Sequence, residues 1–255
     1  MVYTQIAIVN ISTVVSDANG SIITSAMNQV LPTFCNDWNL PLVTAVYVGL
    51  GKTTTIPLKV FLMDTSDVSG ALGYHDELNN LPYGKCFAKT VLQYGPLLWT
   101  ANPSVPTFAQ TVCHEVFEML IDLYCNTWAM LADNKTLYAY EVCDPVESNP
   151  LTVTVATTST SSVKSKAAPF LPTTTTTITN TKVGLSDWIL PQWFNSQATR
   201  GPFNHNNTLT APFQLSPNGY VIKTKAGTIS YVFGESVTEE HKSRILAKRR
   251  VTKRG

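Results

Sequence analysis

Residues 107–124 read TFAQTVCHEVFEMLIDLY, and most of these side chains are apolar. At the helical increment of about 100° per residue, His114, Glu115, Glu118 and Asp122 fall within one arc of about 100°, while apolar side chains fill most of the remaining surface. A helix on a protein surface has the opposite proportion of polar and apolar positions. The sequence therefore predicts a largely buried helix over about 107–124, with one polar stripe that lines a cleft.

Three carboxylates and an imidazole share this polar stripe, although their flanks are apolar. Carboxylates are costly to gather in a medium of low dielectric constant unless a cation or protons neutralise them. A histidine and a glutamate four residues apart on a helix point the same way, so His114 and Glu118 can share one ion. The pattern predicts a divalent metal site; the alternative interpretation is a stripe that faces water and binds nothing.

Acidic residues beyond the helix provide candidates for the third metal ligand. Glu141 lies in an otherwise apolar setting, and Asp144 and Glu147 follow it. We predict that Glu141 or Asp144 joins the two helix ligands, that Glu115 is the general base, and that Asp122 and Glu147 support the ligands from outside. Zinc is the predicted metal, and calcium is the alternative because carboxylates are hard ligands.

The rest of the chain predicts an α+β fold. Ahead of the long helix, apolar runs predict strands, and a helical periodicity predicts one further helix. The predicted strands cover 6–11, 42–48, 58–63 and 85–92, and the further helix covers 21–38. Four regions follow from composition: a core at 1–147, a Thr/Ser-rich β-insertion or linker at 148–182, an irregular aromatic-rich region at 183–238, and a basic tail at 239–255.

Composition excludes several classes of protein. No stretch approaches the roughly 20 apolar residues of a membrane span, and the N-terminus lacks the features of a signal peptide, so we expect no membrane span and no secretion by that route. The five cysteines are odd in number and include no Cys-x-x-Cys pair, which indicates buried free thiols rather than disulfides. These features favour a protein that is cytoplasmic in its host or associated with a virion.

The basic residues are unevenly distributed. Seven of the 18 basic residues lie in the last 14 positions, among them Lys248, Arg249 and Arg250. Such a tail can contact nucleic acid or an acidic protein surface. A solvated terminus is the alternative interpretation.

The motif resembles a known family. His114-Glu115-x-x-Glu118, followed by Glu141-Val-x-Asp144, resembles zincin-like metallopeptidases in which a glutamate replaces the second histidine of the motif. Proteins of bacteriophages and their hosts look similar over a longer span, roughly residues 55–220 without the Thr-rich insertion.

This resemblance implies a zincin-like core, in which a mixed sheet precedes the active-site helix and an antiparallel edge strand borders the cleft. It implies peptide hydrolysis by metal-activated water, with a substrate peptide along the edge formed by Gly73, Tyr74 and His75. A tyrosine such as Tyr138 or Tyr140 would assist. The chain departs from the family pattern at Leu123, where the family usually has proline, so the helix is expected to continue for another turn.

Two functions follow from the sequence. The first is a metallopeptidase that acts on a peptide or protein. The second is a structural or assembly protein of a bacteriophage virion with a degenerate zincin site, whose partners would be other virion proteins. A weaker third interpretation is a sugar-binding platform formed by Trp188, Trp193 and Phe194.

Overall fold

The computed structural model describes residues 3–165 and 168–248, with the backbone alone for 159–175 and 247–248. Five strands form a mixed sheet in the order β2-β1-β3-β5-β4. They are β1 (Gln5–Asn10), β2 (Thr44–Val48), β3 (Lys59–Met63), β4 (Gly73–Leu78) and β5 (Leu81–Phe87). All pairings are parallel except that of β4 with β5, so β4 is an antiparallel edge strand. The predicted α+β class with a mixed sheet is confirmed.

The hairpin of β4 and β5 corrects the sequence prediction. The predicted strand over 85–92 has both bounds wrong. The observed strand β5 begins at Leu81, and a helical turn, α2 (Ala88–Val91), follows it. Asn79 and Asn80 both have positive φ, 54° and 61°, which is the backbone of a two-residue hairpin turn that asparagine tolerates well. The Asn-Asn pair is the local signal for the turn.

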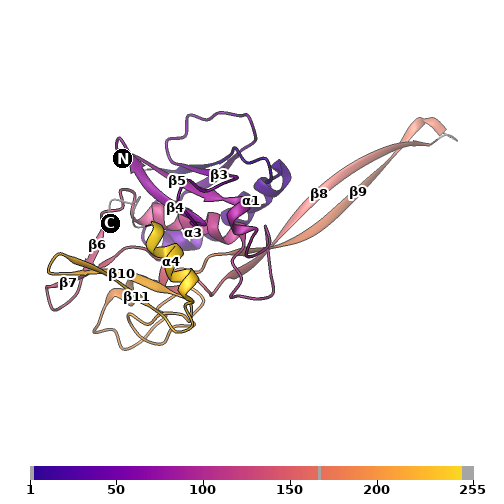
Figure 1. The fold of residues 1–255 in the computed structure, drawn as a ribbon. Coiled ribbons are helices and arrows are strands. Elements are labelled where there is room, and N and C mark those ends of the chain that lie inside the picture. Colours follow the sequence, from indigo (N-terminus) through magenta and orange to yellow (C-terminus); the bar gives the residue numbers. More distant parts are fainter. Residues whose placement is uncertain (1–2, 166–167, 249–255) are drawn as a thin grey trace.

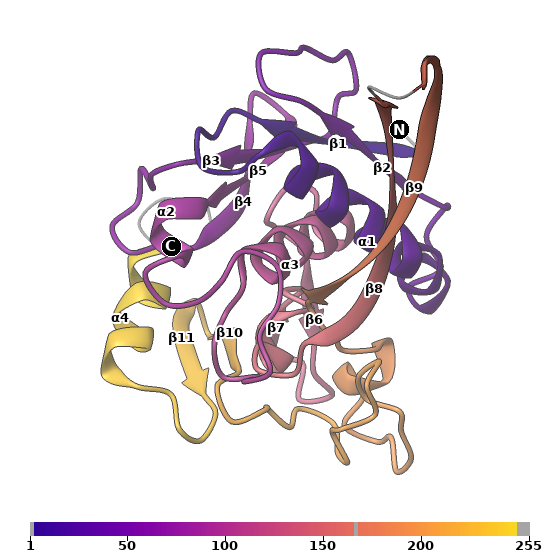
Figure 2. The ribbon, with the colours of Figure 1, turned by 90° about the vertical axis from the view of Figure 1, so that its right-hand side faces the viewer.

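Two long helices pack beneath this sheet. The first, α1 (Asp17–Asp37), begins at Ser16, whose side chain accepts a hydrogen bond from the Asn19 N–H, and Pro32 lies inside it. The second, α3 (Phe108–Ile121), lies between the five-stranded sheet and a second sheet (Figures 1 and 2).

The end of α3 differs from the prediction. The helix does not continue past Asp122 to residue 124 or beyond. Instead Oδ1 of Asp122 accepts hydrogen bonds from the backbone N–H groups of Asn126 and Thr127, which turns the chain away from the helix axis. A short polar side chain that bonds nearby backbone ends a helix without proline.

The second sheet has four strands in the order β11-β10-β7-β6. These strands are β6 (Trp128–Met130), β7 (Thr136–Ala139), β10 (Tyr220–Lys225) and β11 (Thr228–Phe233). Short 3₁₀ helices, η1 (Asp144–Val146) and η2 (Pro191–Phe194), interrupt the irregular segments, and α4 (Glu239–Lys248) ends the described chain. Lys248 is the last described residue, while Arg249 and Arg250 of the predicted tail lie outside the described residues.

The Thr/Ser-rich region forms an antiparallel hairpin of β8 (Leu151–Ser165) and β9 (Ala168–Leu185). Figure 1 shows that the hairpin projects away from the rest of the molecule. Its base is anchored, because Val155, Val183 and Leu185 are buried in the main core. At about 3.4 Å per residue, strands of this length span about 50 Å.

An aromatic cluster ties the two long helices together. Phe34 of α1 stacks on Phe117 of α3 with ring centroids 4.1 Å apart, and Trp188 packs edge-on against both rings. Trp188 and Trp193 are fully buried, so they cannot form the sugar-binding platform considered above. All five cysteines are free and buried, as predicted. Within the described chain, no helix has both the length and the apolar character of a membrane span.

Candidate metal centre

The polar stripe of α3 is buried. His114, Glu115 and Glu118 keep only 6%, 2% and 3% of their surface exposed. Their side chains meet groups from β4, from the segment after β7, and from β10. The stripe therefore faces a polar interior, and the interpretation that it faces water is wrong.

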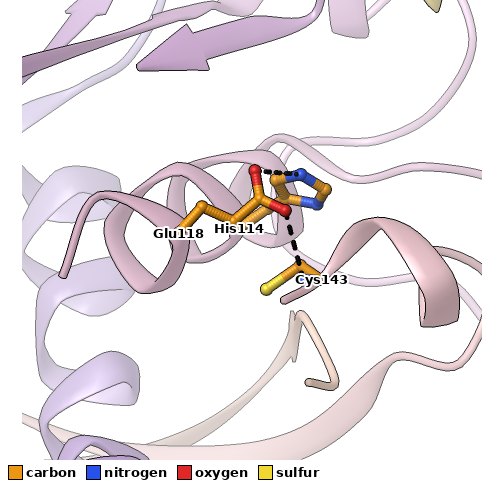
Figure 3. Close-up of side chains that lie close together, drawn as sticks. All are labelled: His114, Glu118 and Cys143. Carbon is orange, nitrogen blue, oxygen red and sulfur yellow. Dashed lines mark hydrogen bonds and ion pairs between the residues drawn. The ribbon is translucent and has the colours of Figure 1, made fainter. Parts of the chain in front are cut away.

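Three donor atoms converge at His114. Its Nε2 atom lies 3.0 Å from Oε2 of Glu118 and 3.1 Å from Oδ1 of Asp144. The other oxygen of Glu118, Oε1, accepts a hydrogen bond of 3.1 Å from the backbone N–H of Cys143 (Figure 3) and one of 3.3 Å from the backbone N–H of Asp144. These amides start η1, where N–H groups have no partner within the helix. They fix one oxygen of Glu118 and orient the other toward the imidazole.

The acids determine the charge of His114. Burial lowers the pKa of its imidazole, but the charge of Glu118, hydrogen bonds to Asp144 and Glu118, and the charge of Glu115 outweigh it, so the pKa lies well above the usual value. The acids around His114 therefore favour the protonated form of its imidazole. A metal ion at this position would replace its proton.

His75 of β4 belongs to the same cluster, although the sequence suggested only a substrate contact for it. Its Nδ1 lies 3.6 Å from Oε2 of Glu115 and 3.9 Å from Oε2 of Glu118, and its Nε2 lies 3.7 Å from Oε2 of Glu141. Alternate residues of a strand share a face, so Gly73 and His75 both point toward α3. An edge strand beside α3, in which every second side chain faces that helix, is the pattern from which His75 could have been predicted as part of the cluster.

The other residues of the predicted substrate edge lie in β4 but are buried. Tyr74 directs its hydroxyl to the carboxylate of Asp67, at 3.0 and 3.1 Å, and packs against Phe87. A Cβ at Gly73 would lie 2.8 Å from Oε1 of Glu115, so only glycine permits the close approach of β4 to α3.

The substitution Gly73→Ala should destabilise the protein by about 1–3 kcal/mol, the usual cost of overpacking a close-packed interior. Its methyl group would press against Glu115 and against Cγ2 of Thr111, 2.9 Å away. Urea unfolding measures the effect. Unchanged stability would mean that Glu115 does not lie against β4.

The remaining predicted residues are not all brought to this cluster. Asp122 caps α3, with the backbone contacts described above. Glu147 lies 3.1 Å from Nε2 of His241 in α4. Lys248 ends α4, at the limit of the described chain.

Two residues of the centre were missed by the sequence analysis. Tyr220 of β10 hydrogen-bonds to Asp144; burial above all, followed by the charges of nearby acids, raises the pKa of its phenol well above 10. It lines a small cavity of about 40 Å³ with His75, Glu118 and Glu141. Cys143 is the second, and burial raises the pKa of its thiol well above 9.

The tyrosines named from the sequence lie elsewhere. Tyr138 packs against Trp193 and Phe213, and Tyr140 packs against Trp38 and Phe194. Tyr220 is separated from the helix motif by about a hundred residues, so no local pattern points to it.

The donor set fits a divalent metal ion. Two overlapping groups have their ligand atoms within 4.8 Å of one another, namely His114 with Glu118 and Cys143, and His75 with Glu118 and Glu141. A tetrahedral zinc ion separates its nitrogen and oxygen ligands by about 3.3 Å, close to the distances of 3.0 and 3.1 Å from His114 Nε2 to Glu118 and to Asp144. Imidazole and carboxylate are both common zinc ligands.

Comparison with models of protein families, with curated proteins and with solved structures found no match for this chain. The resemblance to zincin-like metallopeptidases therefore depends on the motif and its spacing. A function has to be inferred from the geometry of the site.

Proposed function

We propose that this protein binds a divalent metal ion, zinc in the first place, and hydrolyses peptide bonds. The ligands are His114, Glu118 and Asp144. The observation that carries the proposal is that two carboxylate oxygens, one of Glu118 and one of Asp144, lie 3.0 and 3.1 Å from Nε2 of His114 at a buried position. His75 lies between Glu141 and the carboxylates of Glu115 and Glu118, and would orient these groups beside the ligands.

Glu115 is the general base in this proposal. Nδ1 of His75 lies 3.6 Å from Oε2 of Glu115 and 3.9 Å from Oε2 of the ligand Glu118, so Glu115 faces the same buried cluster as the proposed ligands. A bound zinc ion supplies an activated water and stabilises negative charge on the substrate oxygen. The carboxylate of Glu115 would accept a proton at this position and give it to a leaving amine.

The surrounding architecture supports a zincin-like core. A mixed sheet precedes α3, and its antiparallel edge strand β4 lies against that helix. An edge strand can pair with an extended peptide through its backbone. Tyr220, hydrogen-bonded to Asp144, would hold the carboxylate of that proposed ligand in position.

Metal analysis tests the ligands. Protein purified without chelator should contain about one equivalent of zinc. The variants His114→Ala and Glu118→Ala should lose most of it, because a site with two of its three protein ligands binds zinc much more weakly. His205→Ala is the matched control, since this histidine stacks on Trp188 away from the cluster. Equal zinc in all four proteins would refute the metal site.

Cobalt substitution tests the third ligand. If Asp144 completes the site, the cobalt protein lacks the near-ultraviolet absorption of a thiolate bound to cobalt. A strong thiolate band that disappears in Cys143→Ser would instead assign Cys143, which lies within the first group of candidate ligand atoms.

A second candidate function is an assembly component of a virion that keeps the fold without catalysis. The projecting hairpin of β8 and β9 favours it (Figure 1), because a two-stranded ribbon far from the core offers its edges to a neighbouring subunit. The hydrolysis assay described in the Discussion separates the two functions.

A further inference from the structure

A larger cavity lies beside the metal centre. It has a volume of about 350 Å³ and is lined by His114, Glu115 and Gln110 of α3, by residues 103–106, and by α4. Figure 1 shows α4 in front of α3, and Figure 2 shows the same helix on one side of the molecule. The cavity therefore has the candidate catalytic residues at one wall and α4 at another.

Gln110 presents an unused acceptor at this cavity. Its Nε2 donates a hydrogen bond of 2.7 Å to the backbone carbonyl of Glu147, which fixes the orientation of the amide. Its Oε1 is buried and has no hydrogen-bond partner among the described residues, and Gln110 as a whole is only 6% exposed. A buried acceptor in a fixed orientation is suited to an N–H group of a ligand.

Arg244 of α4 presents a cation at the same cavity. Its guanidinium stacks on the ring of Tyr94 at 4.3 Å, which holds its plane. Its guanidinium lies 3.7 Å from Oε1 of Glu240, a carboxylate that is 67% exposed, and ion pairs with such exposed groups are weak. The other acid of this wall, Glu147, is engaged by His241. An arginine held in this way can bind a carboxylate through two parallel N–H groups.

We propose that this cavity binds the carboxylate of a peptide, with Arg244 as its partner and Gln110 Oε1 accepting a peptide N–H. The carboxylate belongs to an acidic side chain or to a C-terminus. This proposal rests on the proposed function, since His114 and Glu115 of the candidate metal centre also line the cavity. Binding of the carboxylate can be measured without hydrolysis of the peptide.

Binding of short acetylated dipeptides to the zinc-loaded protein, measured by ligand-observed NMR, tests the proposal without turnover. Acetyl-Ala-Glu-amide and acetyl-Ala-Gln-amide differ only in the side-chain charge. Acetyl-Ala-Ala with a free C-terminus and its amide differ only in the terminal charge. In at least one pair, the carboxylate peptide should bind about tenfold more tightly, the effect of a charged hydrogen bond. The pair that discriminates identifies the source of the carboxylate.

Variants of α4 assign the effect to Arg244. Arg244→Gln should abolish the preference for the carboxylate, and Arg244→Lys should keep part of it, since lysine retains the charge without the planar fork. Lys242→Gln is the matched control on the same helix, because Lys242 pairs with the exposed Glu239. Thermal melting of each variant checks that α4 remains folded.

Two results would overturn the proposal: equal binding within both peptide pairs, including no binding at all, or a preference that Arg244→Gln retains. Carboxylate preference without any hydrolysis would support this inference and count against the proposed function. The two can therefore fail separately.

Discussion

Glu115→Gln should lower the rate of casein hydrolysis by about a hundredfold or more, since a positioned general base contributes about 10²–10⁴ in rate. Glutamine keeps the size of the side chain but cannot take a proton. The zinc content should not change, because Glu115 is not proposed as a ligand. Cleavage of unfolded casein in the presence of zinc, followed by mass spectrometry of the products, measures the effect.

Glu239→Gln is the control for this assay, because Glu239 is exposed on α4 and pairs only with Lys242 among the described contacts. It should retain full activity. Hydrolysis that is the same in wild type and Glu115→Gln would come from a contaminant or another mechanism. Such a result, or no hydrolysis at all by protein that contains zinc, would favour the assembly function.

Asp187→Ala should destabilise the protein by about 3 kcal/mol, because it leaves buried donors without an acceptor. The carboxylate of Asp187 accepts hydrogen bonds from the backbone N–H groups of Trp188 and Asn206 and from Nδ2 of Asn204. These bonds hold the segment that places Trp188 against Phe34 and Phe117. Chemical denaturation at constant pH measures the loss.

Asp133→Ala is the matched control for this substitution. Asp133 also accepts three hydrogen bonds, from Lys135 and Thr136, but in an exposed turn where water can replace them. Its loss should cost clearly less than that of Asp187. Equal losses would mean that burial does not determine the cost.

The same carboxyl group makes stability depend on pH. Burial raises the pKa of Asp187 from 3.8 to about 7, although its hydrogen bonds from Asn204, Trp188 and Asn206 oppose the shift. The folded state therefore binds the proton more tightly than the unfolded state. The stabilisation from this group is complete below pH 4 and is lost as the pH rises through 7.

The difference in unfolding free energy between wild type and Asp187→Ala should accordingly shrink between pH 4 and pH 8. Unfolding curves recorded across this range measure it. A difference that grows with pH would show that the hydrogen bonds outweigh burial and that the group is ionised throughout.

The sequence predicted the elements that depend on local patterns. The periodicity of 107–124 indicated α3 and its polar stripe, and the apolar runs indicated β1, β2 and β3. The end of α3 was wrong, because Asp122 bonds the backbone four and five residues ahead and stops the helix without a proline signal. The strand at 85–92 was wrong because the Asn79-Asn80 turn was overlooked.

The candidate metal centre was predictable only in part, for a physical reason. Residues on one helix have a fixed geometry, so the grouping of His114, Glu115 and Glu118 follows from their spacing. His75 and Tyr220 come from strands that reach the cluster only through long-range pairing of two different sheets. No spacing along the chain encodes that approach.

The base of the projecting hairpin lies next to the start of α3. The N–H of Gly184 in β9 donates to the carbonyl of Leu98 at 2.7 Å, and Nε1 of Trp99 donates to Oγ1 of Thr152 in β8 at 3.1 Å. A Cβ at Gly184 would lie only 3.4 Å from Oγ1 of Thr107, which caps α3. The ribbon, although it projects from the molecule, is thus tied at its base to the first turn of the helix that carries His114, Glu115 and Glu118.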